Sequence, residues 1–350
     1  MAYTSIDDPS KHFQIATYTG DGNDDRQVTN DGNSDLKPDW VWLKDRTQAE
    51  SHAVFDSTRG ATVRLQPNNS NAESTETATL KSFTTDGFTV GTSASVNNGS
   101  NPDEYVAWQW KANGGTTSSN TDGSITSTVQ ANTDAGFSIV TFTGTGSTAT
   151  VGHGLGVAPV TIIAKNRDSS ANWSVKHHKT PNNYDFFSLN TTDTRTANDS
   201  IWTQTDPTTS VFSIGTATAI NQSGQDIVAY CFAEKKGYSK FGSYHGNGNI
   251  QGPFVYTGFK PAFILIKTDS GFKNWYMWDS TRSSFNPVDE SISITSSAEL
   301  TGYDPIDILS NGFKVRDADA TWNSYNITTY YWAFAHNPFV TSTGIPTTAR

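Results

Sequence analysis

The chain has 350 residues, of which 17% are charged, and its 34 acidic and 24 basic residues give a net charge of −10. The basic residues are scattered along the chain, which argues against nucleic-acid binding by phosphate neutralisation. The single cysteine, Cys231, excludes an intramolecular disulfide, and its apolar neighbours predict a buried free thiol. No apolar run approaches the length of a membrane-spanning helix, and the first residues lack the features of a signal peptide.

In chain order, residues 1–12 are expected to form an N-terminal arm, followed by a first unit at 13–112. A polar segment at 113–136 has the composition of a flexible linker and contains a candidate short strand at 124–129. The second unit spans 137–236 and the third 237–338, with a short connection that predicts a fixed angle between them. Residues 339–350 are expected to form a C-terminal arm with the length to cross to a neighbouring chain.

The three units share one sequence register. Each has a proline before its strongest apolar run, and a lysine stands six positions after that proline. Aromatic or histidine side chains stand fourteen positions after it, and polar ones eighteen positions after it. Shared positions also include glycine pairs upstream, a phenylalanine about fifty residues downstream, and closing blocks centred on an alanine. In unit order these sets are Pro38, Pro159, Pro261; Lys44, Lys165, Lys267; His52, Trp173, Trp275; Asp56, His177, Asp279; Gly20/Gly22, Gly144/Gly146, Gly246/Gly248; Phe88, Phe212, Phe313; and Ala107, Ala229, Ala333.

The apolar blocks are short, rich in β-branched and aromatic residues, and bounded by Gly, Asn, Asp and Pro, which is typical of strands and turns. About one hundred residues with six or seven such blocks is the size of one antiparallel β-sandwich. We therefore predict an all-β chain of three tandem antiparallel β-sandwich (jelly-roll-like) repeats in series. Larger units formed by exchanging strands remain an alternative. The glycine pairs are interpreted as hairpin turns.

An Asp-Ser-Thr-Arg motif occurs in the first and third units, and the second unit has His-His-Lys-Thr at the same place. An aspartate and an arginine three positions apart could bind a pair of sugar hydroxyls, or could brace a turn by a local ion pair. The structural interpretation is favoured because the motif recurs by duplication. The residues concerned are Asp56, Arg59, Asp279 and Arg282.

Aromatic side chains in polar loops are the best candidates for a binding surface, since aromatic faces stack on sugar rings and anchor protein interfaces. They are Trp202, Trp322 and Tyr325. The competing interpretation is that they pack on the ends of the sandwiches.

Two further groups of polar residues carry no site prediction. The histidines at 153, 177 and 178 have no metal-binding spacing, and adjacent strand residues point to opposite faces, so neither a metal nor a cofactor is expected. Hydrolysis of a polysaccharide would need two acids at a set separation. The candidate pairs, Asp289 with Glu290 and Asp304 with Asp307, lie in turn-like sequence typical of solvated loops.

Several blocks resemble a known family. PDWVWLKDR, DSTRG, DGFTVG, YVAWQWKA, GPFVYTGFKPAFILIKTD and YYWAFAHNPF are similar to blocks in repeat-containing virion structural proteins of tailed, mostly marine bacteriophages. The resemblance covers nearly the whole chain and is most specific at 227–270. It implies a virion structural protein, presumed to be a tail fibre or a surface lectin-like module, and it implies no catalytic residues.

We therefore expect a non-enzymatic phage virion surface protein, a tail fibre or receptor-binding adhesin. A capsid decoration or head-fibre protein is the alternative, and a polysaccharide depolymerase is a third, less favoured one. The expected partners are other virion proteins and a host-surface glycan or protein, with homo-oligomers, for example trimers, and without nucleic acid or membrane insertion. The protein would be made in the host cytoplasm and end on the virion surface.

Overall fold

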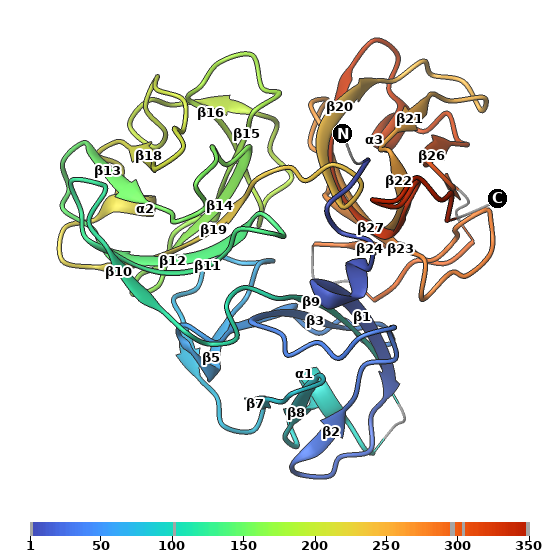
Figure 1. The fold of residues 1–350 in the computed structure, drawn as a ribbon, viewed down its shortest axis with the longest axis horizontal. Coiled ribbons are helices and arrows are strands. Elements are labelled where there is room, and N and C mark those ends of the chain that lie inside the picture. The colour runs from blue at the N-terminus through green and yellow to red at the C-terminus, as the bar shows by residue number, and fades with distance from the viewer. Residues whose placement is uncertain (1–2, 101–102, 295–297, 303–304, 348–350) are drawn as a thin grey trace.

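The computed structural model describes residues 3–100, 103–294, 298–302 and 305–347. Within these ranges the chain is almost entirely β-structure, and every pairing between its strands is antiparallel. The predicted all-β sandwich class is confirmed. The strands form three modules that surround a common centre (Figure 1).

Module 1 pairs a six-stranded sheet with a three-stranded sheet, in the orders β1-β9-β3-β4-β5-β6 and β2-β8-β7. A one-turn 3-10 helix precedes it at Pro9–Lys11. Its elements are β1 (Phe13–Thr19), β2 (Arg26–Val28), β3 (Trp40–Asp45), β4 (Ala53–Asp56), β5 (Gly60–Leu65), β6 (Ser74–Thr75), β7 (Leu80–Phe83), β8 (Phe88–Val90), α1 (Ala94–Asn97) and β9 (Glu104–Trp110).

Module 2 pairs an eight-stranded sheet with a two-stranded one, in the orders β10-β11-β12-β19-β14-β15-β16-β17 and β13-β18. Its elements are β10 (Ser118–Asn120), β11 (Ser127–Asn132), β12 (Phe137–Thr143), β13 (Ala149–Gly152), β14 (Thr161–Asn166), β15 (Ser174–His177), β16 (Asp185–Ser188), β17 (Thr196–Ala197), β18 (Val211–Ile214), α2 (Thr218–Asn221) and β19 (Asp226–Phe232).

Module 3 pairs a five-stranded sheet with a three-stranded one, in the orders β20-β27-β22-β23-β24 and β21-β26-β25. Its elements are β20 (Ser239–His245), β21 (Phe254–Tyr256), β22 (Phe259–Thr268), β23 (Tyr276–Asp279), β24 (Ile292–Ser293), β25 (Ile306–Leu309), β26 (Gly312–Val315), α3 (Ala320–Asn323) and β27 (Thr328–Pro338).

The central strands of each large sheet are buried on both faces. In β22, Ile264 and Ile266 pack against the small sheet of module 3, whereas Phe263 and Leu265 point into a central core shared by all three modules. This arrangement explains why the sequence of the strand is apolar at consecutive positions instead of alternate ones. Seven of the ten tryptophans lie in the central core: Trp40, Trp42, Trp108, Trp110, Trp173, Trp275 and Trp332.

The modules are therefore not arranged in series, as the sequence suggested. A large apolar stripe on each large sheet remains uncovered by its own small sheet, and the three stripes bury one another. Replacing one of the central tryptophans by alanine would cost about 3–5 kcal/mol, because the surrounding side chains belong to three separate modules and cannot easily collapse.

The segment 113–136 is built into the fold instead of linking two modules flexibly. Its strands β10 and β11 extend the large sheet of module 2, and β11 pairs with β12 along residues 128–132. The polar sequence of β10 reflects its position at the edge of the sheet, where its residues are largely exposed, whereas the polar Gln130 of β11 is buried.

The two arms lie on module 3. In the N-terminal arm, Tyr3 donates a hydrogen bond to the carbonyl of Gly258 at 2.7 Å, and Ile6 is buried in the central core. In the C-terminal arm, the backbone N–H of Ser342 donates to Asp7 at 2.6 Å. The parts of both arms that the structure describes thus contact each other and module 3, while residues 1–2 and 348–350 lie outside the described residues.

The glycine pairs do not form hairpin turns. Gly20 connects β1 to β2, which belong to different sheets. A Cβ atom on Gly20 would lie 2.2 Å from the carbonyl oxygen of Asn98, just after α1, so the glycine permits a close approach of two backbones. Gly144 and Gly246 make the same approach after α2 and α3. In each module the last residue of the short helix, an asparagine, bonds the glycine loop through its side chain: Asn97, Asn221 and Asn323.

The strand register also corrects the alignment of the closing blocks. Trp108 lies opposite Trp42, Tyr230 opposite Ile163, and Trp332 opposite Leu265. Trp332, not the residue after Ala333, is therefore the counterpart of Trp108, and the third block is shifted by two residues from the predicted alignment. The small size shared by Ala107, Ala229 and Ala333 was a misleading guide.

Candidate functional site

Asp56 and Arg59 form a fully buried ion pair at the end of β4, with Arg59 Nε 2.5 Å from Asp56 Oδ2. Asp56 also accepts hydrogen bonds from the backbone N–H groups of Thr58 and Arg59, so the pair braces the turn between β4 and β5. Burial alone would lower the pKa of Arg59, but the Asp56 carboxylate and the Tyr230 hydroxyl raise it overall. Because neither side chain is exposed, this pair cannot bind a sugar at the surface.

The same pair joins two modules. Tyr230 of module 2 donates its hydroxyl to Asp56 Oδ2 at 2.7 Å. In the same way, Trp108 of module 1 donates its indole N–H to Asp279 Oδ2 of module 3 at 3.0 Å, and Asp279 pairs with Arg282 at 2.6 Å. The Asp-Ser-Thr-Arg motif therefore has the structural role that the duplication favoured, and it also holds neighbouring modules together.

Module 2 replaces this motif and keeps the contact. Trp332 of module 3 donates its indole N–H to Thr161 Oγ1 at 2.9 Å, and the buried ring of His177 packs edge-on against Trp332. Thr161 and His177 are paired on adjacent strands. The three contacts run in one direction around the centre: module 1 to module 3, module 3 to module 2, and module 2 to module 1.

A second ring of contacts runs in the same direction. The side chains fourteen positions after the prolines each meet a backbone carbonyl of the neighbouring module. His52 Nε2 lies 2.9 Å from the carbonyl oxygen of Ser293, Trp173 donates to Gln66, and Trp275 donates to Ser188. The repeated register in the sequence thus records the contacts between modules as well as the folding of each module.

Three buried lysines form another repeated set. Lys44 donates to the backbone carbonyls of Asp45 and Gln48, and Lys165 does the same to Asn166 and Ser169. Lys267 donates to Thr192 and Lys273. Burial lowers the pKa of each of these lysines to about 8. They satisfy loop carbonyls, and they are not exposed to a ligand.

Two of the three predicted aromatic binding residues are buried. Trp202 is fully buried in the core of module 2 beside Phe212, and Trp322 packs against Tyr276 and Trp278 in module 3. Polar neighbours in the sequence suggested exposed loops, but the rings fill the ends of the sandwiches. Tyr325 is 78% exposed, as a binding residue must be.

The exposed apolar side chains gather on module 3. Seven of the nine large apolar side chains that are most exposed in the described part of the chain belong to this module: Ile250, Phe254, Tyr256, Phe272, Phe285, Leu300 and Tyr325. Phe254 and Tyr256 stand two apart on β21 and therefore face the same side of the small sheet. Beside them lie Lys314, paired with Phe254, and an ion pair of Arg316 with Asp307.

The histidines are structural where the structure describes them. His178 Nε2 lies 2.8 Å from the carbonyl oxygen of Phe241, and His153 Nε2 lies 3.2 Å from that of Thr208. In the described ranges no three His, Cys, Asp or Glu side chains are placed to hold a metal ion. Cys231 is a buried free thiol, as predicted, and burial raises its pKa.

Asp289 and Glu290 line a surface hollow of about 410 Å³ on module 3, with Arg282, Phe285 and Pro287. Both carboxylates accept a hydrogen bond from Ser283 Oγ at 3.2 Å. Burial and the nearby Glu299 raise the pKa of Glu290. Asp307 instead forms an ion pair with Arg316, and Asp304 lies outside the described residues.

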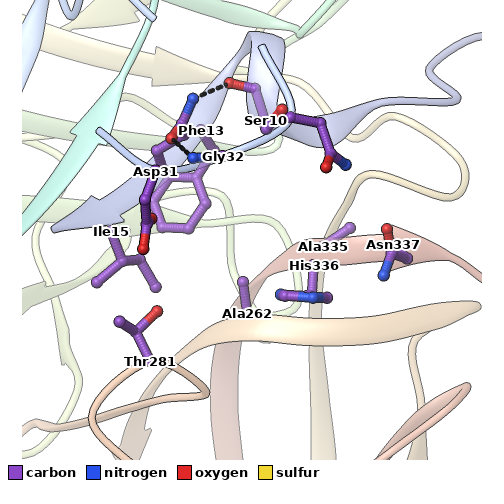
Figure 2. Close-up of a pocket in the computed structure, with 12 residues that line it drawn as sticks. Ser10, Phe13, Ile15, Asp31, Gly32, Ala262, Thr281, Ala335, His336 and Asn337 are labelled. Carbon is purple, nitrogen blue, oxygen red and sulfur yellow. Dashed lines mark hydrogen bonds between the residues drawn. The ribbon is translucent and has the colours of Figure 1, made fainter. Parts of the chain in front are cut away.

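A groove of about 450 Å³ lies between module 1 and module 3 (Figure 2). Module 1 contributes the outer edge of β1 and the loop at 31–33, and module 3 contributes the ends of β22 and β27. The Gln14 amide ties the loop to β1, donating to Ser10 and Ser34 and accepting from Gly32. The lining residues are Ser10, Phe13, Gln14, Ile15, Asp31, Gly32, Asn33, Ala262, Thr281, Ala335, His336 and Asn337.

Sequence reasoning missed both this groove and the aromatic pair on β21. The groove is formed where two units 250 residues apart meet, and no local pattern marks it. The pair was not marked by its pattern either, because Phe254, Val255 and Tyr256 are all apolar, whereas a half-exposed strand is recognised by alternating apolar and polar residues.

In the described ranges the three α-helices have four residues each, so none is long enough to cross a membrane. No curated protein and no solved structure matches the chain. One protein family, described as a domain of unknown function (DUF7483), matches residues 8–338, a range that includes nearly all of the three modules. Since this match covers far more than half of the chain, the protein belongs to the DUF7483 family.

Proposed function

We propose that the protein is a non-enzymatic surface component of a bacteriophage virion, a tail-fibre or receptor-binding adhesin that contacts a host-surface glycan or protein through module 3. The resemblance of its sequence blocks to phage virion proteins motivates the class. The concentration of exposed apolar side chains on module 3 carries the assignment of the contact surface. Exposed apolar side chains that gather in one region mark interaction sites.

The outer face of β21 suits a sugar or a polar protein surface. Phe254 and Tyr256 are 48% and 53% exposed, so each offers much of its ring. Flat aromatic faces bind the apolar side of a sugar ring, while the neighbouring Lys314, Arg316 and Asp307 can bond its hydroxyls.

A binding assay on host cells or purified host-surface polysaccharide tests this proposal. The double variant Phe254→Ala and Tyr256→Ala should weaken binding at least tenfold, with a smaller loss for Tyr325→Ala. Gln27→Ala is the matched control, because Gln27 is an exposed residue on β2, the counterpart of β21 in module 1. Equal binding by the double variant and the unmodified chain would refute the role of module 3.

The shape of the molecule favours a second candidate, a capsid decoration protein. The three modules close around one core instead of extending as a rod, and both arms lie on module 3 (Figure 1). A compact body of this kind can occupy a position on the capsid lattice, and it can equally form the end of a fibre. Antibody labelling of intact particles separates the two: label over the head supports decoration, and label confined to the tail supports the adhesin.

A further inference from the structure

The outer edge of β1 lacks a hydrogen-bonding partner at Ile15, a position where the equivalent strands of the other modules have one. Just before β1, the N–H of Lys111 donates a hydrogen bond to the carbonyl of His12. Just after β1, the N–H of Gly20 donates to the carbonyl of Asp103. Because hydrogen bonds alternate along an antiparallel pair, the even-numbered residues face β9, and Phe13, Ile15 and Thr17 direct their N–H and C=O groups away from it. No described residue bonds these backbone groups of Phe13, Ile15 and Thr17.

Module 2 fills the same edge with a strand. Ile139 of β12 is the counterpart of Ile15, since both stand two residues after the first phenylalanine of their strand. Gln130 of β11 lies opposite Ile139. Its buried amide donates to Thr58 Oγ1 at 2.8 Å and accepts from the backbone N–H of Gly115 at 2.8 Å, so it also contacts module 1.

In module 3, two side chains bond the outward backbone groups of one residue at this edge. Phe241 of β20 is the third counterpart of Ile15, because it lies opposite Trp332 as Ile15 lies opposite Trp108. Its N–H donates to Glu234 at 3.4 Å, and its carbonyl is 2.8 Å from His178 Nε2. At the position of Ile15, two of the three equivalent edges are thus satisfied by the chain itself.

The open edge coincides with the groove between modules 1 and 3. Thr281, the counterpart of Thr58 in the Asp-Ser-Thr-Arg motif, lies across the groove from Ile15 (Figure 2). Its hydroxyl has no hydrogen-bond partner within the described ranges, whereas that of Thr58 binds Gln130. Burial lowers the pKa of His336 on the same wall, and Lys260 adds to this effect.

We propose that this groove binds an extended segment of a partner polypeptide, which adds to β1 as an antiparallel strand and places a glutamine or asparagine opposite Ile15. The model for the occupant is β11, which the chain itself places on the equivalent edge of module 2. Strand addition to an exposed sheet edge supplies affinity through backbone hydrogen bonds, and the amide position supplies specificity. The groove is large enough for such an insertion, since its volume lies in the range of ligand sites.

The probe is a fluorescent peptide with the sequence of residues 125–134, ITSTVQANTD, measured against the intact protein by anisotropy. We expect saturable binding that falls at least tenfold when the peptide glutamine is replaced by alanine. Thr17→Pro should also reduce binding at least tenfold, because it removes an outward N–H of β1. Its fold should survive, since proline is tolerated on an edge strand where the N–H faces solvent.

Thr141→Pro is the matched variant in module 2. Thr141 lies opposite Thr128 of β11, so this proline should destabilise the fold where Thr17→Pro does not. Should Thr17→Pro fail to fold, Thr281→Val tests the same groove from module 3 and should weaken peptide binding about threefold or more.

The proposal is overturned by absence of binding at millimolar peptide, by equal binding of the glutamine and alanine peptides, or by displacement of β11 detected as new protease cleavage at 127–132. Concentration-dependent dimers of the protein that Thr17→Pro abolishes would assign the edge to a second copy and also reject a partner polypeptide. None of these outcomes depends on binding by Phe254, Tyr256 or Tyr325, which do not line the groove, so the result is independent of the proposed adhesin surface.

Discussion

Modules 1 and 2 meet through a partly buried network in which module 1 supplies the negative charge. Glu73 of module 1 accepts two hydrogen bonds from Arg167 of module 2, both at 2.8 Å, and also contacts Arg59 at 3.3 Å. Asp56 joins the network through Arg59 and the Tyr230 hydroxyl. The junction of modules 3 and 1 has the same polarity, with Glu299 of module 3 bonded to Arg46 at 2.8 Å.

Modules 2 and 3 meet at the equivalent place with the charges exchanged. Arg195 of module 2 stands near the position of Glu73, and it pairs with Asp269 of module 3 at 3.0 Å. Asp269 lies eight positions after its proline, where module 2 has Arg167. Arg195 also pairs with the buried Asp185 at 2.7 Å, as Glu73 pairs with Arg59.

This comparison shows which parts of a junction the fold requires. An aromatic donor, an acceptor and one ion pair are present at all three junctions, but the sign of the pair and the kind of acceptor vary. The exchange also distinguishes neighbours, because module 2 presents arginine on both sides, Arg167 and Arg195, and so attracts only an acidic partner at each. Like charges in a wrong pairing would be repelled.

The largest expected effect comes from removing Asp56, the buried acidic residue at the junction of modules 1 and 2. Asp56→Ala leaves Arg59 buried without its main partner and removes the acceptor of Tyr230, so we expect a loss of about 3–5 kcal/mol in the free energy of unfolding. His177→Ala, at the equivalent position of the junction between modules 2 and 3, should cost about 1–3 kcal/mol, since it removes packing against Trp332 and leaves no charge unpaired. Urea unfolding monitored by tryptophan fluorescence measures both losses. Equal losses would contradict the distinction between the two junctions.

Charge reversal at the exchanged junction should have the next largest effect. Arg195→Glu places a third carboxylate beside Asp185 and Asp269 and should cost about 2–4 kcal/mol. Adding Asp269→Arg restores one opposite-charge pair but leaves Asp185 facing a glutamate, so we expect it to recover only part of the loss. A double-mutant cycle on urea unfolding gives the coupling energy, and a full recovery would show that Asp185 does not take part.

The sequence predicted the repeated register well and the geometry between modules poorly. The spacing of Lys44, Lys165 and Lys267 follows from copied strands and loops, and each lysine does lie in the same place in its module. The central core could not be predicted in this way, because Trp42 and Leu265 are each apolar strand residues whose partners come from other modules. Consecutive apolar positions predicted that both faces of a strand are buried, but they did not predict which residues cover the second face.

The expected exposure of two candidate binding residues was wrong for a related physical reason. Trp202 and Trp322 follow polar sequence, yet a large ring near the end of a sandwich removes more apolar surface from water by packing than by remaining in a loop. The Asp-Arg motif was correctly favoured as structural. Its second role, as the acceptor for a neighbouring module, required contacts between residues more than 170 positions apart.

The buried lysines predict a pH dependence that all three modules share. Their pKa in the folded chain is about 8, below the ordinary value of 10.5, so the unfolded chain binds more protons between these two values. Stability should therefore rise with pH from about 8 toward 10, by about 1–2 kcal/mol for each lysine between pH 7.5 and 9.5. Thermal unfolding across this range checks it. Lys165→Met should show a smaller rise than the unmodified chain, and identical pH profiles would contradict the assignment.

The smallest expected effect comes from an exposed ion pair, which is compared with a buried ion pair of the same length. Arg316 lies 2.7 Å from Asp307 on the outer sheet of module 3, the same separation as between Arg195 and Asp185 at the junction. The Arg316 side chain is 44% exposed and that of Asp185 is fully buried, so water screens the first pair and not the second. We expect Arg316→Ala to change the free energy of unfolding by less than about 1 kcal/mol, and Arg195→Ala to change it several times more. Parallel urea unfolding of the two variants makes the comparison. A loss for Arg316→Ala as large as that for Arg195→Ala would mean that burial does not determine how much these ion pairs stabilise the fold.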